Sequence, residues 1–241
     1  MTKVYPTNIL GHTFDGQVME FEDYSTWKLG KKISEKSFCF GSDKRKGVFT
    51  ELQAVYPCHQ ISPESNNKEG IGTADRSTYA LPTDTCWSEP EYMAVELLTQ
   101  NKCSSSPQLY SFNISVQESE QMPVPGGYFF ALLMEKLPGV TLDPKVFFTE
   151  YSFEKREKIR AAFLRACSEV ADHCVGICDS RLQNLIYDEE NDKCYLIDYE
   201  DASGPWMQCA GNDYTPGCGS ADELDISLWG LSEKKKERFC R

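Results

Sequence analysis

One long amphipathic helix constrains the fold of this chain more than any other feature of its sequence. Ser152 fits the N-cap position and Glu154 suits the first turn, so the helix is expected to run from about Phe153 to Cys174. Apolar residues recur on one face of this segment in steps of four, three and four: Ile159, Phe163, Ala166 and Val170. This spacing predicts a helix that packs one side against a core.

A compact β-hairpin is expected shortly after this helix. The apolar runs 184–187 and 194–197 flank the sequence Asp188-Glu-Glu-Asn-Asp192, whose carboxylates and amides favour turns. Asn184 opens the first run and Asp198 follows the second, so the hairpin would bring both side chains to the same edge.

Asp179 lies five residues before Asn184, in the loop between the helix and the hairpin. Phosphoryl transfer from ATP needs one oxygen-bearing group near the attacking hydroxyl and two more on Mg²⁺. Asp179, Asn184 and Asp198 could supply these groups at one place. Taken singly, each residue is equally well explained as a turn former. It is the conjunction of helix, loop, D-x-x-x-x-N, hairpin and Asp that favours kinase-like ancestry.

The rest of the chain predicts an α+β protein that changes character near residues 136–140. Further elements are expected as a β-rich stretch at 14–61, a helix at 89–102, strands at 109–116 and 128–135, and a short helix at 222–231. Residues 62–88 are polar and rich in turn formers, and are expected to form a loop-like insert. Strands first and helices later fit two unequal lobes around a cleft.

Charge and cysteine content limit the classes of partner. The net charge of −12 argues against nucleic acid as a partner, yet it leaves a nucleotide open, because main-chain N–H groups and Mg²⁺ can hold phosphates. No signal-peptide pattern and no run of ~20 apolar residues is found, which predicts a cytoplasmic or nuclear protein without a membrane partner. The eleven cysteines are accordingly expected to be reduced, and no paired C-x-x-C spacing supports a zinc site.

Several motifs together suggest a family: Phe38-Cys-Phe-Gly41, Met134-Glu-Lys-Leu-Pro-Gly139, Ile159-Arg-Ala-Ala162, Asn184-Leu-Ile and Cys194-Tyr-Leu-Ile-Asp-Tyr-Glu-Asp201. The chain resembles the protein-kinase-like and aminoglycoside-phosphotransferase-like superfamily, and within it a set of fungal kinase-like proteins. The resemblance implies a single two-lobed kinase-like domain over residues 1–241. Its β-rich N-terminal lobe would cover 14–135, and a reduced, mainly helical C-terminal lobe would cover 140–241.

The resemblance also implies roles for individual residues. Asp179 would be the catalytic base, and Asn184 and Asp198 the metal ligands for Mg²⁺ bound with ATP. Met134–Leu137 would form the hinge between the lobes, where the main chain holds adenine.

Within that hinge, Glu135 and Leu137 are the expected cofactor-binding residues. Glu91 would be the helix carboxylate that orients a strand lysine, and Asp225 would brace the catalytic loop.

Two functions stay open at this point. One is an ATP/Mg²⁺-dependent phosphotransferase that acts on an unknown hydroxyl acceptor, and it is favoured by the three intact site residues. The other is a catalytically impaired pseudokinase that serves as a binding or scaffolding module for a protein partner. It is favoured by Ile177, which stands where such loops usually carry His. It is also favoured because no convincing phosphate-binding lysine is found, and Lys68 is only the nearest upstream candidate.

Overall fold

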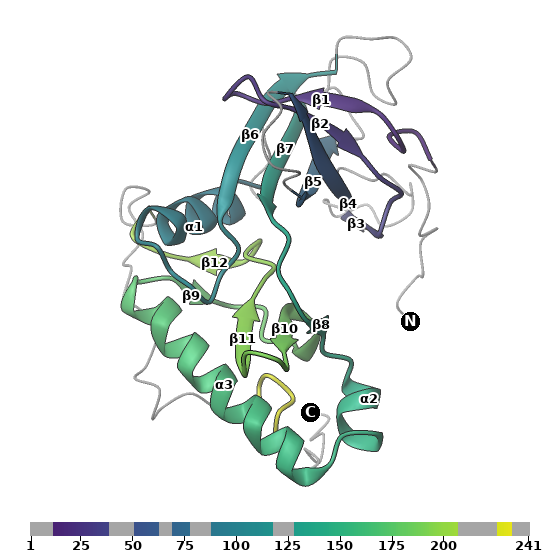
Figure 1. Cartoon of the computed structure of the whole chain (residues 1–241). Coiled ribbons are helices and arrows are strands. Elements are labelled where there is room, and N and C mark those ends of the chain that lie inside the picture. The colour runs from purple at the N-terminus through teal and green to yellow at the C-terminus, as the bar shows by residue number, and fades with distance from the viewer. Residues whose placement is uncertain are drawn as a thin grey trace, which may run out of the picture. The chain divides into compact units, whose positions relative to one another are not determined.

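The computed structural model describes residues 12–38, 51–62, 69–77, 88–117, 128–206 and 226–232. The chain divides into two compact units. The first comprises Met1–Ser88 and Leu109–Lys136, and the second comprises Glu89–Gln108 and Leu137–Arg241. Figure 1 labels the elements of both, and each unit is described here by itself.

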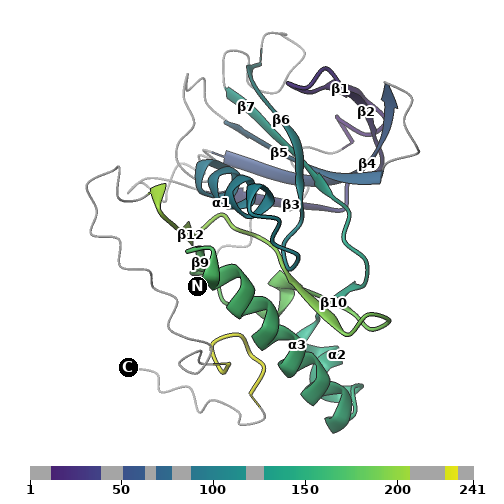
Figure 2. The ribbon, with the colours of Figure 1, turned by 60° about the vertical axis from the view of Figure 1, so that its left-hand side comes forward.

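The first unit is an antiparallel sheet. Its strands are β1 (Val18–Glu20), β2 (Thr26–Leu29), β3 (Ser34–Phe38), β4 (Glu51–Ser62), β5 (Glu69–Ser77), β6 (Leu109–Val116) and β7 (Tyr128–Glu135). The order across the sheet is β1-β2-β4-β5-β7-β6, with β3 paired to β4 off this path (Figure 2). The β-rich character of 14–61 and the strands expected at 109–116 and 128–135 are therefore confirmed.

The loop-like insert expected at 62–88 is wrong for its central part, because β5 forms there. This strand pairs with β4 on one side and with β7 on the other. Its sequence is poor in β-forming residues, so local propensity indicates a turn, and the hydrogen bonds of two neighbouring strands override it. Gly70 shows why a small residue is needed, since a Cβ there would lie 3.1 Å from the carbonyl oxygen of Met134 and 3.2 Å from the ring of Trp27.

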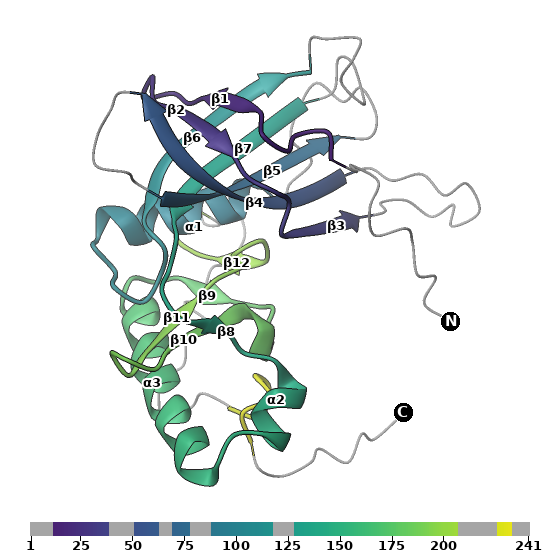
Figure 3. The ribbon, with the colours of Figure 1, turned by 45° about the vertical axis from the view of Figure 1, so that its right-hand side comes forward.

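The sheet curls until its two end strands meet. The main-chain N–H of Glu22, just after β1, donates to the carbonyl of Phe112 in β6 at 3.0 Å. The side-chain amide of Asn113 in β6 donates to the carbonyl of Glu20 in β1 at 3.0 Å. Figure 3 shows β1 beside β6. The core of the unit is formed by Phe14, Phe21, Trp27, Leu29, Ala54, Tyr56, Cys58, Phe129, Ala131 and Leu133. Contact between β1 and β6 thus helps to enclose an apolar core.

The second unit mixes helices with short strands. Its helices are α1 (Ser88–Gln100), α2 (Pro144–Thr149), α3 (Phe153–Asp172) and a single 3₁₀ turn at Leu182–Asn184. Its strands are β8 (Val140–Thr141), β9 (Gly176–Ile177), β10 (Leu185–Asp188), β11 (Lys193–Leu196) and β12 (Ala202–Ser203). The helices expected at 89–102 and 153–174 and the hairpin are confirmed, whereas α2, β8, β9 and β12 were not expected.

Helix α3 organises the second unit. The hydroxyl of Ser152 caps it by accepting the N–H of Lys155 at 3.2 Å, as the sequence indicated. The predicted apolar face is buried, and the helix packs against β11. The ring of Phe163 on this helix also contacts the ring of Trp229, with centroids 5.0 Å apart.

The short helix expected at 222–231 is wrong for residues 226–230, which form turns. Instead of continuing a helix, this segment buries Trp229 and Leu231, and the carbonyl of Leu231 accepts a hydrogen bond from the guanidinium of Arg160. Residues 222–225 lie outside the described part of the chain.

None of the described helices is both long enough and apolar enough to span a membrane.

Candidate functional site

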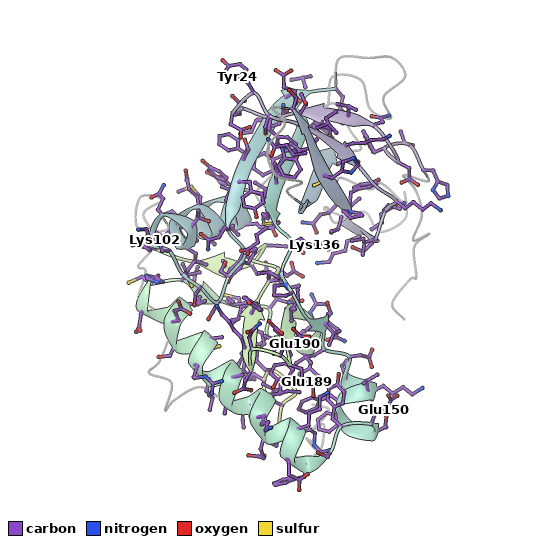
Figure 4. All side chains as sticks on the ribbon, viewed as in Figure 1. Tyr24, Lys102, Lys136, Glu150, Glu189 and Glu190 are labelled. Carbon is purple, nitrogen blue, oxygen red and sulfur yellow. The ribbon has the colours of Figure 1, made fainter. Side chains whose placement is uncertain are left out.

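The hairpin of β10 and β11 brings Asn184 and Asp198 to its open end. Leu185 pairs with Leu196 in the ladder, and the N–H of Ile197 donates to the carbonyl of Asn184 at 3.0 Å. Asp198 is the next residue along the chain. The opposite end of the hairpin is the turn that carries Glu189 and Glu190 (Figure 4).

A second short ladder brackets the same segment of chain. Ile177 in β9 pairs with Ala202 in β12. Asp179 follows β9 by two residues, and Asp198 precedes β12 by four. The loop that contains Asp179 and the turn that contains Asp198 therefore each lie between the two antiparallel ladders.

Direct hydrogen bonds fix Asp179 to Asn184. The side-chain amide of Asn184 donates to the carbonyl oxygen of Asp179 at 3.0 Å and to its carboxylate at 3.2 Å. Within the loop, the N–H of Arg181 donates to the Asp179 carbonyl at 3.0 Å. Asn184 is buried, and since its amide nitrogen points to Asp179, its amide oxygen points away from that carboxylate.

Arg181 is a neighbour of Asp179 that the sequence did not single out. Its Nε donates to a carboxylate oxygen of Asp179 at 2.8 Å, and its Nη2 contacts the same oxygen. The hydrogen bond that Arg181 donates to Asp179 raises the pKa of Arg181, and the charges of Asp179, Asp198 and Glu200 raise it further. The available signal was a basic residue between the Asp and the Asn of D-x-x-x-x-N, close in sequence to both.

Asp198 adopts a main-chain conformation that few residues other than glycine take. Its φ is 69°, in the left-handed region where Asp and Asn are enriched among non-glycine residues. Tyr199, the next residue, is fully buried, which raises the pKa of its hydroxyl. Strained backbone of this kind persists when its surroundings determine it, so the fold sets the main-chain conformation of Asp198.

The donor set fits magnesium that arrives with a nucleotide. Asn184 and Asp198 offer an amide oxygen and a carboxylate, both of which are hard oxygen ligands. Among the residues that the structure describes, no group of three or more His, Cys, Asp or Glu side chains is arranged to hold a metal. Mg²⁺ is usually bound by one or two carboxylates together with substrate phosphates rather than by a protein cage.

The other predicted site residues lie in different parts of the chain. Glu91 is buried in the first turn of α1, in the second unit. Glu135 ends β7 in the first unit, and Leu137 opens the following segment of the second unit. Their nucleotide-binding roles stay predictions. Lys68 and Asp225 fall outside the described residues.

A polar cavity of about 410 Å³ lies elsewhere in the second unit, between α3, the hairpin turn and the loop after α1. Three of its charged groups, Glu169, Arg165 and Asp192, contact neighbours that also line it. Glu169 accepts hydrogen bonds from Ser104 and Ser105, and Arg165 pairs with Asp192 at 2.9 Å. These contacts join three elements of the unit, so the cavity lining has a structural role.

Comparisons with known proteins give likenesses to solved structures alone. No protein-family model matches the chain, and no curated protein matches it. Among solved structures, the chain is similar to the kinase PK-1 of Cydia pomonella granulovirus, with 14% sequence identity and a TM-score of 0.41. The likeness covers 74% of this chain and 52% of that kinase, so the chain spans about half of the kinase's length.

Proposed function

We propose that this protein is a kinase-like protein that binds a nucleotide with Mg²⁺ and transfers a phosphoryl group to a hydroxyl acceptor. The observation that carries the proposal is the convergence of Asp179, Asn184 and Asp198. Two ladders and the hydrogen bonds of Asn184 to Asp179 hold these residues in one small region. Phosphoryl transfer is catalysed mainly by positioning and by charge stabilisation, so a preorganised set of oxygen groups is what it requires.

Each of the three residues has a distinct role in this proposal. The amide oxygen of Asn184 and the carboxylate of Asp198 would hold Mg²⁺, and the bound ion would supply positive charge to the phosphates. Asp179 orients the acceptor hydroxyl and takes its proton. The hydrogen bonds from Asn184 keep the Asp179 carboxylate in position for that step.

A pseudokinase is the second candidate, and the composition of β5 favours it. Kinases place a phosphate-binding lysine on the strand that precedes the helix carrying the partner glutamate. In this chain β5 is the strand before α1, and the sequence of Glu69–Ser77 contains no lysine. Losing one contact that stabilises the transition state typically slows catalysis by ~10²–10³-fold. A protein of this kind would bind nucleotide and turn it over slowly or not at all.

Calorimetric titration of the purified protein with ATP tests nucleotide binding, and the titration is run once in the presence of Mg²⁺ and once in the presence of EDTA. We expect tighter binding with Mg²⁺. Asp198→Asn should abolish that difference, because Asn adopts the same left-handed conformation but lacks the charge. Asp201→Asn is the matched control, since Asp201 is exposed and lies three residues farther on, and it should behave as the parent does. Equal ATP affinity with and without Mg²⁺ in the parent would contradict the proposal.

Turnover separates the two candidates. If the parent transfers phosphate, Asp179→Asn should remove turnover while it leaves ATP binding in place, because the residue is assigned to the acceptor and not to the metal. If the parent binds ATP in a magnesium-dependent way and yet shows no turnover, the pseudokinase is the correct description.

A further inference from the structure

The polar cavity of about 410 Å³ in the second unit has walls that are fastened to one another. Helix α3 forms one wall and packs against β11, the strand that follows the hairpin turn (Figure 1). The carbonyl of Ser105, in the loop after α1, accepts the N–H of Leu196 in β11 at 2.9 Å. The N–H of Ser104 donates to Glu169 of α3 at 2.7 Å. The cavity is therefore preformed, and its volume lies in the range of about 300–1,000 Å³ that is typical of small-molecule sites.

The two carboxylates of the cavity already accept hydrogen bonds from the protein. Glu169 accepts them from the two serines of the loop after α1. Asp192 accepts one from the guanidinium of Arg165 at 2.9 Å and one from the hydroxyl of Tyr187 at 2.8 Å. Because these carboxylate oxygens are occupied by protein donors, the cavity offers little to a cationic ligand.

The two cations of the cavity keep most of their donors unused. The ammonium of Lys193 lies 4.9 Å from the centroid of the Tyr195 ring, and it forms no ion pair with any residue that the structure describes. Arg165 directs its Nη2 at Asp192, while its Nε and Nη1 have no partner among the described residues. The hydrogen-bonding capacity that the lining leaves open is therefore mainly that of positively charged donors, which suits an anionic ligand rich in acceptors.

We propose that this cavity binds a small phosphorylated molecule, with its phosphate group contacting Arg165 and Lys193. A phosphate group carries about −1.5 to −2 charges at pH 7 and three strong acceptor oxygens, so it can use the spare donors of both cations. A single carboxylate group has less charge with which to offset the repulsion of the two acids in the lining. The site uses none of the residues assigned to phosphoryl transfer, so this proposal does not depend on the proposed function.

The test is calorimetric titration of the full-length, nucleotide-free protein with inorganic phosphate, in EDTA and at constant ionic strength. We expect the parent to bind phosphate and Lys193→Gln to bind it at least about 10-fold more weakly, because a charged donor is lost. Lys145→Gln is the matched control. It removes the same charge from α2 in the same unit, Lys145 is exposed and does not line the cavity, and the affinity for phosphate should stay unchanged.

Asp192→Asn tests the sign of the charge effect. Residue 192 has a φ of 47°, a left-handed conformation that Asn also adopts, so the variant keeps the shape of the turn. It removes one negative charge from the lining, and we expect it to bind phosphate more tightly than the parent does. A variant that merely loosened the fold would bind phosphate more weakly.

The inference is overturned if the parent binds no phosphate, or if Lys193→Gln binds it as tightly as Lys145→Gln does. Weaker binding by Asp192→Asn than by the parent would also overturn it. Phosphate bound at the proposed nucleotide site would be insensitive to Lys193→Gln. The magnesium-dependent titration with ATP reports on that other site, so the failure of this inference and the failure of the proposed function are seen in different measurements.

Discussion

The side-chain amide of Asn184 donates to both the main-chain carbonyl and the carboxylate of Asp179, at 3.0 and 3.2 Å. One residue thus closes the loop around the proposed base through its amide nitrogen. Asn184 therefore has an effect on the stability of the loop that is separate from its proposed role as a metal ligand. Stability measurements on metal-free protein isolate the effect on the loop.

Asn184→Ala should lower the free energy of unfolding by about 1–2 kcal/mol without any metal or nucleotide, because it leaves the Asp179 carbonyl without its side-chain donor in a partly buried loop. Urea denaturation followed by fluorescence measures the change. Gln183→Ala is the matched control, because Gln183 is exposed and adjacent in the chain, and it should stay within about 0.5 kcal/mol of the parent. Equal stability of the two variants would show that the amide does not order the loop.

Gly139→Ala should destabilise the second unit by about 3 kcal/mol. Gly139 has a φ of 100°, and a Cβ at that position would lie 2.4 Å from the carbonyl oxygen of Tyr187 in β10. The variant combines left-handed strain with a clash against main chain, and neither can relax cheaply. Gly230→Ala is the control for strain alone, because its φ is 72° and no atom lies within 4 Å of the added Cβ.

Thermal denaturation compares these two glycine variants. We expect Gly230→Ala to cost about 1 kcal/mol, which is the strain contribution by itself. A cost for Gly139→Ala no greater than that for Gly230→Ala would mean that the approach of Gly139 to β10 is looser than the structure indicates.

Glu169 should make stability depend on acidic pH. Burial opposes its ionisation, but hydrogen bonds from Ser105 and Ser104 prevail and lower the pKa of Glu169 below its ordinary value of 4.5. A lowered pKa in the folded state means that the charged form stabilises the fold above about pH 4.5. That stabilisation is lost as the pH falls through the folded-state value.

Glu169→Gln should therefore unfold more easily than the parent at pH 7, by about 1 kcal/mol, and the difference should shrink below about pH 4. Urea denaturation across this pH range checks the trend. Glu190→Gln serves as the control, since Glu190 is exposed in the hairpin turn. The free energies of unfolding of Glu169→Gln and of the parent are compared at each pH. If their difference does not change with pH, Glu169 is not charged in the folded state.

Thiol reactivity should divide the cysteines into two groups. Burial raises the pKa of Cys194 to about 12 and that of Cys103 to about 11, so little thiolate is present at pH 8. Cys174 and Cys178 are exposed. In the native protein, iodoacetamide should therefore label Cys174 and Cys178 well before Cys103 and Cys194, as followed by peptide mass mapping.

After denaturation without reductant, all eleven cysteines should react, because the sequence favours reduced thiols. The six in the described residues form no disulfide with one another. Release of further reactive thiols by reductant, or bound zinc in stoichiometric amount, would contradict this expectation.

The sequence by itself determined the elements whose signals are local. The apolar steps from Ile159 to Val170 specify the buried face of α3, and a hydroxyl at Ser152 specifies where that helix begins. The turn-forming run at 188–192 and its two apolar flanks specify the hairpin of β10 and β11. The register of a hairpin determines which residues face each other at its open end. The sequence therefore also placed Asn184 beside Ile197, the residue before Asp198.

Tertiary structure decided what depends on partners far away in the chain. β5 is a strand because β4 and β7 hold it on both sides, although its glycines and aspartate indicate a turn. The ladder of β9 and β12 is two residues long, which is too short to produce an alternating apolar pattern in the sequence. The turns at 226–230 replace an expected helix because packing on α3 outweighs local preference.

The same division applies to the candidate site. Spacing along the sequence selected Asp179, Asn184 and Asp198. Their residue types are those that phosphoryl transfer would need, and the predicted hairpin brings Asn184 close to Asp198 in space. Two features depend on tertiary structure alone: the left-handed main-chain conformation of Asp198 and the ion pair between Arg181 and Asp179. A side-chain rotamer and a strained φ are set by the groups packed around them, and those groups come together only when the chain has folded.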